Sequence, residues 1–319
     1  MLFSGSNGFH FRRPFRLHRA RAMRERHRGV YFYERRGGQL YRHSFIHRWL
    51  HDTGIRTVSA IVCNPGRPLP GTFNTFRGFS AALLPPVETG LAGALVEPIL
   101  SHIHEILTPF DPCGAELLLD WFAHVMQLPG ERTRLGLVVF GGFGCGKDFL
   151  STWHSEHVVG PLYSEVVLHV SETKRVADSV LVLSRLRGGG AANLLALKEL
   201  ILRYDCRRRG RAEENYSNVF ATTESPRFFN MVKSHREFVA FRCSETRAGD
   251  YPYFVSLRDY LVRPDVIRAW YQTLMARDLA AYRDTLSFQH AADVLQPWRP
   301  PCDDEPPMVL SDTDSDTDH

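Results

Sequence analysis

The sequence predicts an α/β fold with a parallel sheet, and three features point to it. Short apolar runs typical of buried strands, such as "LGLVVF" (135–140) and "SVLVL" (179–183), occur together with segments of helical spacing. A glycine-rich turn directly follows the first of these runs. The chain has 319 residues, of which 44% are hydrophobic, and this is ample for a packed core. Strands that alternate with helices after such a turn indicate an α/β core with helices covering the sheet.

The N-terminal part is predicted to be mixed in structure. Residues 29–50 form a hairpin around Gly37 and Gly38, and a short helix follows. The stretch 78–90 is expected to be a loop. Two helices are then predicted from "LVEPILSHIHEILT" (95–108) and "GAELLLDWFAHVMQ" (114–127), in which apolar residues recur at helical spacing.

The predicted strands lie in the middle of the chain. After 135–140, the apolar runs at 164–170, 179–183 and 217–223 have the same character, and a helix at 194–204 separates the last two. From these patterns we expect five regions. They are a basic arm with a hairpin and a short helix (1–60), a helical region (61–130), the α/β core (131–245), a helical extension (246–300) and an acidic disordered tail (301–319).

Charge is distributed very unevenly. Residues 1–60 contain thirteen arginines and three acidic residues, a net charge of +10, whereas residues 302–319 contain seven acidic residues and no lysine or arginine. An arm this basic commonly contacts nucleic acid phosphates, although a solvated arm or a targeting sequence has the same composition. No apolar run approaches the roughly 18 residues of a membrane-spanning helix. A cytoplasmic or nuclear protein without a membrane partner is therefore expected.

The glycine-rich turn carries the strongest chemical signal. Its sequence fits the phosphate-loop pattern G-x-x-x-x-G-K, in which backbone N–H groups and a lysine surround a phosphate. The candidate nucleotide-binding residues are Gly141, Gly142, Gly144, Cys145, Gly146, Lys147 and Asp148. Asp148 stands where the pattern has a serine or threonine for magnesium. A carboxylate can bind magnesium, but it also repels phosphate oxygens, so its role stays open.

The order of motifs resembles one family. "TFNTFRGFSA" (72–81), the helices before the loop, "LKELI" (197–201), "NYSNVFATTES" (215–225) and "HREFVAF" (235–241) are similar to segments of the superfamily 3 helicase domain of virus- and phage-type primase-helicases. The resemblance covers about 60–296. It implies an AAA+-like P-loop NTPase core, ATP with Mg²⁺ as cofactors, single-stranded DNA as a partner and a ring such as a homo-hexamer. It also implies a primase or polymerase partner in a viral or mobile-element replication system.

Several catalytic positions of the family do not match. Ser184 and Arg185 stand in place of the adjacent aspartate and glutamate that orient magnesium and the attacking water, and Glu172 is the remaining candidate for a catalytic carboxylate. The polar sensor position falls on Thr222 or Thr223, with Asn218 nearby. Of two arginines that the family places before a phenylalanine, only Arg236 is kept, because the second position is Glu237. The resemblance thus implies a catalytic role for Arg236 and an impaired hydrolytic half of the site.

Arginines also mark a candidate nucleic-acid contact. The segment "RYDCRRRGR" (203–211) falls where the family has a basic hairpin facing its central channel, and it suits single-stranded backbone contacts through Arg207, Arg208, Arg209 and Arg211. An exposed basic loop without a partner is the alternative. The fifteen histidines show no metal-binding spacing, so no dedicated metal site is predicted.

Three functions remain open from the sequence. The first is an active helicase-type ATPase, and the second is a pseudoenzyme that binds DNA or acts as a scaffold in a replication complex. The third is a nucleoside or nucleotide kinase, which also has a phosphate loop after a strand. Measuring ATP turnover separates the first two, and a phosphate-acceptor assay identifies the third.

Overall fold

The centre of the molecule is a five-stranded parallel sheet. The computed structural model describes residues 20–54, 57–66, 69–166, 179–186, 190–208 and 211–283. Across the sheet the strands follow the order β11-β5-β10-β7-β6, and each neighbouring pair is parallel. In chain order they are β5 (Gly136–Phe140), β6 (Tyr163–Val166), β7 (Leu181–Leu186), β10 (Asn218–Thr223) and β11 (Phe238–Arg242).

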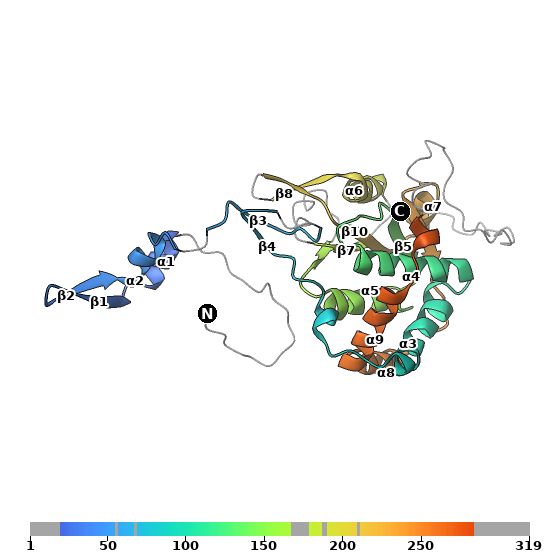
Figure 1. The fold of residues 1–319 in the computed structure, drawn as a ribbon. Coiled ribbons are helices and arrows are strands. Elements are labelled where there is room, and N and C mark those ends of the chain that lie inside the picture. Colours follow the sequence, from blue (N-terminus) through green and yellow to red (C-terminus); the bar gives the residue numbers. More distant parts are fainter. Residues whose placement is uncertain are drawn as a thin grey trace, which may run out of the picture.

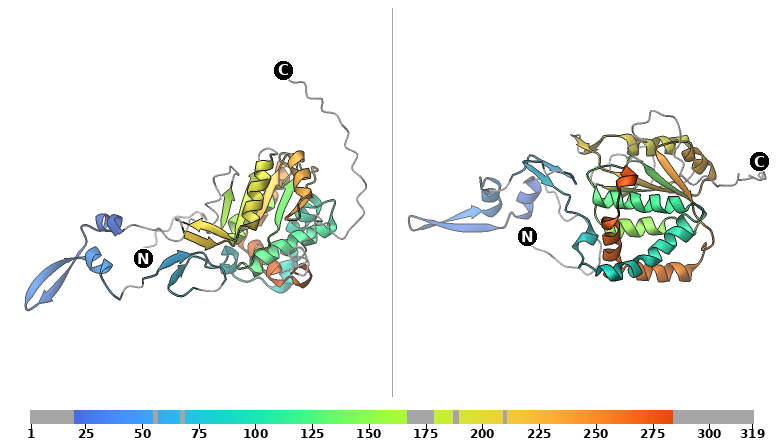
Figure 2. Two further views of the ribbon diagram at one scale, coloured as in Figure 1. Left: turned by 90° about the horizontal axis from the view of Figure 1, so that it is seen from above. Right: turned by 45° about the vertical axis from the view of Figure 1, so that its right-hand side comes forward.

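Helices cover both faces of this sheet, which gives three layers (Figures 1 and 2). One face packs against α6 (Ala191–Leu202) and α7 (Pro226–Lys233). Alternation along β5 explains the two cores: Val138 joins the core beneath α6 and α7, while Leu137 and Val139 join the core on the other face. Because both faces are buried, the strands read as continuous apolar runs in the sequence.

The helical layer on the other face of the sheet is larger and contains most of the described helices. Trp121 and Trp270 are both fully buried there. Asp111 accepts a hydrogen bond from the Gly114 N–H at 2.7 Å and so caps one of these helices at its beginning. The helices are α3 (Thr89–His102), which continues as a π-helical turn (Ile103–Leu107), α4 (Pro112–Gln127), α5 (Phe149–Trp153), which also continues as a π-helical turn (His154–Val159), α8 (Tyr251–Leu261) and α9 (Pro264–Ala276).

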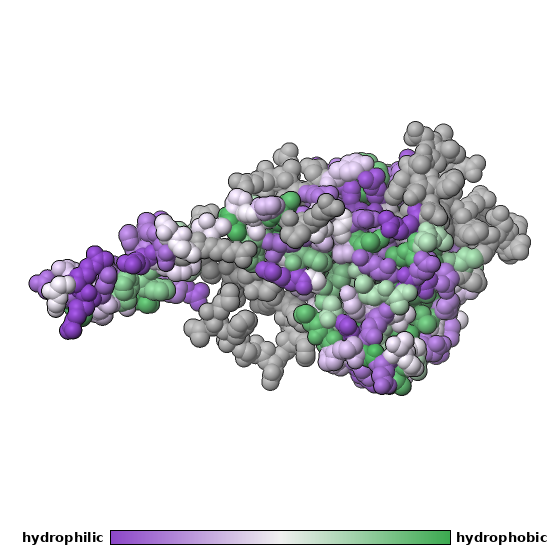
Figure 3. All heavy atoms as spheres, viewed as in Figure 1, coloured by the Kyte–Doolittle hydropathy of each residue, from purple (hydrophilic) through white to green (hydrophobic). Residues whose placement is uncertain are grey.

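The N-terminal elements project from this core (Figure 1). They are α1 (Ala20–Arg26), the antiparallel strands β1 (Tyr31–Arg36) and β2 (Gln39–Ser44), and α2 (Phe45–Leu50). Hydrophilic residues predominate over this projection (Figure 3). The turn uses Gly37 and Gly38 at φ 55° and 86°, a region that favours glycine, and β1, β2 and α2 all lie within residues 29–50, where the sequence predicts a hairpin and a short helix.

Three smaller elements connect or decorate the core. A 3₁₀ turn (Ser80–Leu83) lies inside the segment that was predicted to be a loop. The others are the parallel pair β3 (Ala60–Val62) and β4 (Thr72–Asn74), and the antiparallel pair β8 (Asp205–Arg208) and β9 (Arg211–Glu214). None of the helices in the described part of the chain is long and apolar enough to cross a membrane.

Strand order is the feature that positions the candidate site. β10 comes after both β5 and β7 in the sequence, yet it lies between them in the sheet. In register, Thr223 lies opposite Phe140 of β5 and Thr222 lies opposite Arg185 of β7. The carboxyl ends of these three strands therefore meet at one edge, where ligands of open parallel sheets commonly bind. Of the predicted strands, the one expected at 164–170 is described over Tyr163–Val166 only, and the acidic tail lies outside the described residues.

Candidate functional site

The glycine-rich loop leaves the carboxyl end of the central strand β5 and leads into α5. Gly144 and Gly146 adopt φ values of 74° and 99°, which L side chains rarely tolerate. A Cβ atom on Gly146 would also lie 2.8 Å from the ring of Phe254 on α8. The N–H of Gly141 donates to the Thr223 carbonyl oxygen at 3.2 Å, which ties the start of the loop to β10. We call residues Gly141–Lys147 the cradle.

Lys147 is the buried cation of the cradle. Only 5% of this residue is exposed, and its Nζ donates to the Gly142 carbonyl oxygen at 3.1 Å and to Glu224 Oε1 at 3.0 Å. Asp148 Oδ2 lies 3.6 Å from the same nitrogen. Burial lowers the pKa of Lys147, but the hydrogen bond to Glu224 and the charge of Asp148 outweigh burial and raise it above the ordinary value. The lysine is therefore a charged donor at neutral pH.

Two thiols pack behind the beginning of the cradle. Cys145 and Cys243 are both buried, and a Cβ atom on Gly141 would lie 2.7 Å from Cys145 Sγ and 2.8 Å from Cys243 Cβ. A hydrogen bond from Cys243, aided by nearby Lys147, lowers the pKa of Cys145 to about 7 against the effect of burial. The same hydrogen bond and burial raise the pKa of Cys243. The thiols fill the space that glycine leaves open, so they contribute to the shape of the loop.

His102 supports the cradle from α3. A Cβ atom on Gly146 would lie 3.2 Å from its Cε1 atom, and its Nδ1 lies 2.9 Å from the hydroxyl of Tyr253. Burial lowers the pKa of His102 to about 4, so the ring is neutral at physiological pH. A neutral ring can pack against the loop without placing a second charge beneath it.

Side chains from three strand ends and the loop gather beside the cradle, and we call them the strand-end cluster. Asp148 accepts a hydrogen bond from the Thr222 hydroxyl, and its Oδ1 lies 3.8 Å from Arg185 Nε. The guanidinium of Arg185 also contacts Glu165 Oε1 at 3.2 Å and donates to Thr152 Oγ1 at 3.3 Å. The cluster consists of Asp148, Glu165, Arg185, Thr222 and Glu224.

The strand-end cluster does not fit a divalent cation of the kind the family resemblance implies. Magnesium requires oxygen ligands arranged around it, but the guanidinium of Arg185 has no lone pair to give and repels a second cation. Arg185 instead occupies the space between Asp148 and Glu165, and Glu224 is paired with Lys147. In the described part of the chain, no group of three or more histidine, cysteine, aspartate or glutamate side chains could hold a metal.

The remaining predicted site residues lie away from the cradle or outside the residues that the structure describes. Arg236 precedes β11, and β11 runs parallel to β5, so this arginine lies at the amino edge of the sheet. The five residues of β11 separate it from the loop edge by about 16 Å. The structure therefore does not place Arg236 beside the cradle of its own chain. Its neighbour Glu237 pairs with Lys198 at 3.4 Å.

Glu172 and Arg209 lie outside the described residues. The backbones of Arg207 and Arg208 form part of β8 and that of Arg211 part of β9, but the structure does not describe their side chains. Of the sensor candidates, Thr222 reaches Asp148, whereas Asn218 begins β10 at the far edge. There its side-chain oxygen accepts hydrogen bonds from the N–H and hydroxyl of Thr133 at 2.9 and 3.0 Å, which is a structural role.

Sequence reasoning missed two carboxylates of the cluster, Glu165 and Glu224. Glu224 directly follows β10, and Glu165 lies on β6 at the sheet edge next to β7. Glu224 could have been found by noting that it follows a predicted strand end. Its pairing with Lys147, 77 residues earlier in the chain, depends on the insertion of β10 beside β5.

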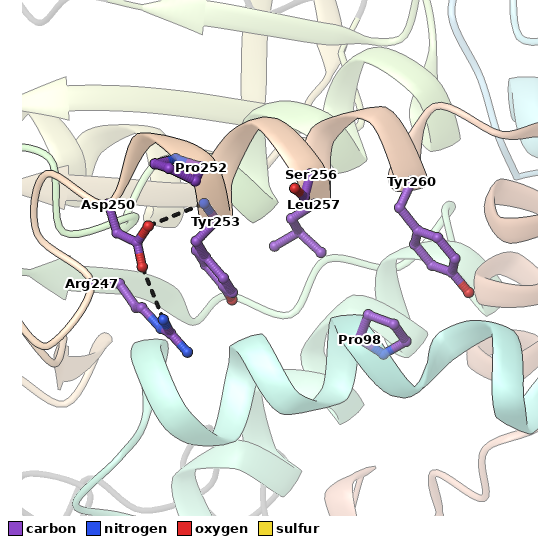
Figure 4. A pocket seen from close by; sticks show the side chains of 8 residues that line it. All are labelled: Pro98, Arg247, Asp250, Pro252, Tyr253, Ser256, Leu257 and Tyr260. Carbon is purple, nitrogen blue, oxygen red and sulfur yellow. Dashed lines mark hydrogen bonds and ion pairs between the residues drawn. The ribbon is translucent and has the colours of Figure 1, made fainter.

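A separate, open surface pocket of about 520 Å³ lies between α3 and α8 (Figure 4). Tyr253, Leu257 and Tyr260 line it together with Pro98. At one end, Arg247 pairs with Asp250 at 2.9 Å, and Asp250 also caps α8 by accepting from the Tyr253 N–H at 3.1 Å. The charged groups of this pocket are therefore engaged in holding the helix that packs behind the cradle.

Comparisons with known proteins give distant structural likenesses. Neither a family model nor a curated protein matches the chain. The chain is similar to the NrS-1 C-terminal region at 11% identity, over 82% of this chain and 70% of that one, with a TM-score of 0.49. It is also similar to an MCM homolog from Methanopyrus kandleri (12% identity, 58% and 45% coverage, TM-score 0.32) and to the JCV helicase (16%, 61% and 59%, TM-score 0.37). This chain thus spans less than two thirds of the last two, and what it does must be inferred from its own site.

Proposed function

We propose that this chain is a helicase-like P-loop protein of a viral or mobile-element DNA replication system, which binds ATP but hydrolyses it poorly. The observation that carries the proposal is the cradle itself. A glycine-rich loop, in which Gly144 and Gly146 adopt positive φ, leads to a buried, charged lysine beyond the carboxyl end of the central strand. Backbone N–H groups and a single lysine are what phosphate binding requires at such a loop.

The strand-end cluster supports the second half of the proposal. Phosphoryl transfer depends on charges placed around the transferred group and on a metal that bridges phosphates. Arg185 stands between the carboxylates that could hold such a metal, and Thr222 hydrogen-bonds Asp148. Among the functions left open by the sequence, this arrangement favours a nucleotide-binding pseudoenzyme over an efficient ATPase.

Calorimetric titration with ATP and ADP tests nucleotide binding. We expect the unaltered protein to bind and Lys147→Ala to lose at least tenfold in affinity, because the buried lysine is the cation placed within the loop. Lys233→Ala is the matched control, since this exposed lysine lies at the end of α7 over the ring of Phe229. Absence of nucleotide binding by the unaltered chain, with or without magnesium, would disprove the proposed function.

Single-stranded DNA is the proposed macromolecular partner, and the N-terminal arm is its proposed site. In the arm, Arg42 lies over the ring of Tyr31 at 4.3 Å, and Tyr33 is 61% exposed. Exposed aromatic rings among arginines suit stacking with bases and contact with phosphates. We expect binding to weaken steeply with salt, and removal of residues 1–28, which carry eight arginines, to reduce that salt dependence. An unchanged affinity and salt slope after truncation would place the contact elsewhere.

A homo-oligomeric ring, such as a hexamer, completes the proposal. Arg236 lies at the edge of the sheet opposite the cradle of its own chain. The family resemblance implies a catalytic role for Arg236, and in a ring an arginine at that edge would exercise this role on the nucleotide of a neighbouring copy rather than on that of its own chain. Sedimentation of the protein with and without nucleotide measures the oligomer, and a monomer in both conditions counts against the ring. A primase or polymerase partner remains part of the same proposal.

A further inference from the structure

Arg185 occupies a central position in the strand-end cluster. It follows Ser184 near the carboxyl end of β7, and it lies in register with Thr222 of β10. Ser184 is buried with 1% exposure, whereas the side chain of Arg185 is 49% exposed. Successive side chains of a strand point to opposite faces, so the guanidinium reaches the loop edge while the serine faces the core.

Arg185 and Lys147 flank the same carboxylate. Lys147 Nζ lies 3.6 Å from Asp148 Oδ2, and Arg185 Nε lies 3.8 Å from Asp148 Oδ1. Both cations are therefore close enough to contact one polyphosphate chain seated at the loop. A guanidinium presents several N–H donors in a plane and binds phosphate oxygens in pairs, so it is well suited to such a contact.

Nearby carboxylates compete with a phosphate for these two cations. Glu165 and Asp148 hold Arg185, Glu224 holds Lys147, and Glu245 lies beside the cradle, with its Oε1 3.1 Å from the Cβ position of Gly142. An incoming phosphate must replace these carboxylates as the partner of the two cations. Since Arg185 is half exposed and has a long flexible stem, it can turn from Glu165 toward a phosphate without disturbing the core.

We propose that Arg185 supplies the positive charge that a divalent cation would otherwise bring, so that the site binds nucleoside di- and triphosphates without magnesium. This inference rests on the proposed function, because it concerns the ligand of the same cradle. Arg185 can take the place of a metal ion because its side chain, which separates Asp148 from Glu165, is itself a cation. A metal-dependent site would instead leave those oxygens free to coordinate.

The main test is titration of the full chain with ADP and ATP, once with EDTA and once with excess magnesium. We expect the two dissociation constants for each nucleotide to agree within about threefold. Arg185→Ala should weaken binding in EDTA by roughly tenfold or more, as expected for loss of a charge-assisted contact, and Arg185→Lys should recover part of it. Arg263→Ala is the matched control, because Arg263 is also ion-paired and its side chain is 47% exposed.

A second measurement follows the metal rather than the nucleotide. Replacing Arg185 by aspartate places a third carboxylate beside Asp148 and Glu165, so Arg185→Asp should bind Mn²⁺ while the unaltered chain should not. Electron paramagnetic resonance of free Mn²⁺ reads this directly, and circular dichroism checks that each variant is folded. If Arg185→Asp fails to fold, the comparison of EDTA with magnesium in the unaltered chain decides the matter alone.

The outcomes separate this inference from the proposed function. Nucleotide binding that requires magnesium, or that is unchanged in folded Arg185→Ala, overturns the inference and leaves the proposed function standing. Mn²⁺ binding by the unaltered chain at this site also overturns it. Failure of any nucleotide to bind in either condition overturns both. Binding in EDTA that depends on Arg185 and not on Arg263 supports it.

Discussion

The cradle and the strand-end cluster lie side by side at one edge of the sheet, but they are built in different ways. The cradle is a continuous stretch of seven residues, Gly141–Lys147, and its function depends on backbone conformation and one lysine. The cluster brings side chains from β6, β7 and β10 and from the residue after the loop, and each partner must suit the others. Because the two regions are built separately, the proposed binding of a phosphate can be tested apart from its cleavage.

The largest expected effect is on the rate of ATP hydrolysis, which depends on the strand-end cluster as well as on the cradle. We expect turnover on the order of 10⁻³ per second or slower, because active phosphoryl-transfer enzymes reach about 1 to 100 per second and each misplaced charge costs on the order of a hundredfold or more. Phosphate release by the unaltered chain, measured with and without single-stranded DNA, checks this. Rapid DNA-stimulated release that Lys147→Ala abolishes would show that the cluster is catalytic after all. Glu172 would then be the first carboxylate to replace.

Acid should destabilise the support of the cradle, because His102 is buried there as a neutral ring. The folded-state pKa of His102 is about 4, below its ordinary value of 6.5. Between these two pH values the histidine is therefore protonated in the unfolded chain but neutral in the folded chain. Stability should therefore fall as pH drops from about 6.5 to 4, by about 3 kcal/mol in all for this histidine.

Denaturant unfolding at a series of pH values measures that loss. His154 also has a pKa lowered by burial, to about 3, and it contributes in the same direction. The contribution of His102 is thus the difference between the unaltered protein and His102→Gln, whose side chain does not titrate. Identical pH dependence in the two proteins would mean that His102 is not buried as a neutral ring.

A single methyl group should damage the cradle specifically. Gly146→Ala adds a Cβ atom at φ 99°, 2.8 Å from the ring of Phe254, so the loop must shift. We expect ATP affinity to fall by roughly tenfold, as for loss of one charge-assisted contact, with the fold retained. Gly93→Ala is the control, because nothing lies within 4 Å of that Cβ position on α3. Equal affinities of the two variants would mean that the loop does not hold the phosphate.

The contact between the two regions should give the smallest effect. Glu224 holds Lys147 at 3.0 Å, and an incoming phosphate must compete with it. Glu224→Gln keeps the shape and removes the charge, so we expect ATP to bind about threefold to tenfold more tightly, the effect of a partly exposed ion pair. Glu116→Gln, distant in sequence and paired with Arg277, is the control. Weaker binding in Glu224→Gln would show that the glutamate positions the lysine rather than competing for it.

The sequence by itself determined the local parts of this protein. The apolar runs predicted the strands because both faces of the sheet are buried, and Gly37 and Gly38 predicted the hairpin turn because that turn needs positive φ. Glycine spacing and one lysine likewise locate the cradle, from Gly141 to Lys147, in the sequence, and its role in nucleotide binding stays a prediction. The domain boundaries drawn from the sequence stay predictions.

Which side chains from these local elements meet one another was decided by the tertiary structure. The sequence showed Arg185 in place of an acid, but only the insertion of β10 between β5 and β7 brings Arg185, Thr222 and Glu224 to the loop. The same topology places Arg236 at the opposite edge, because β11 runs parallel to β5. Side-chain pairing across strands depends on strand order, and strand order is set by packing of the whole sheet rather than by any local pattern.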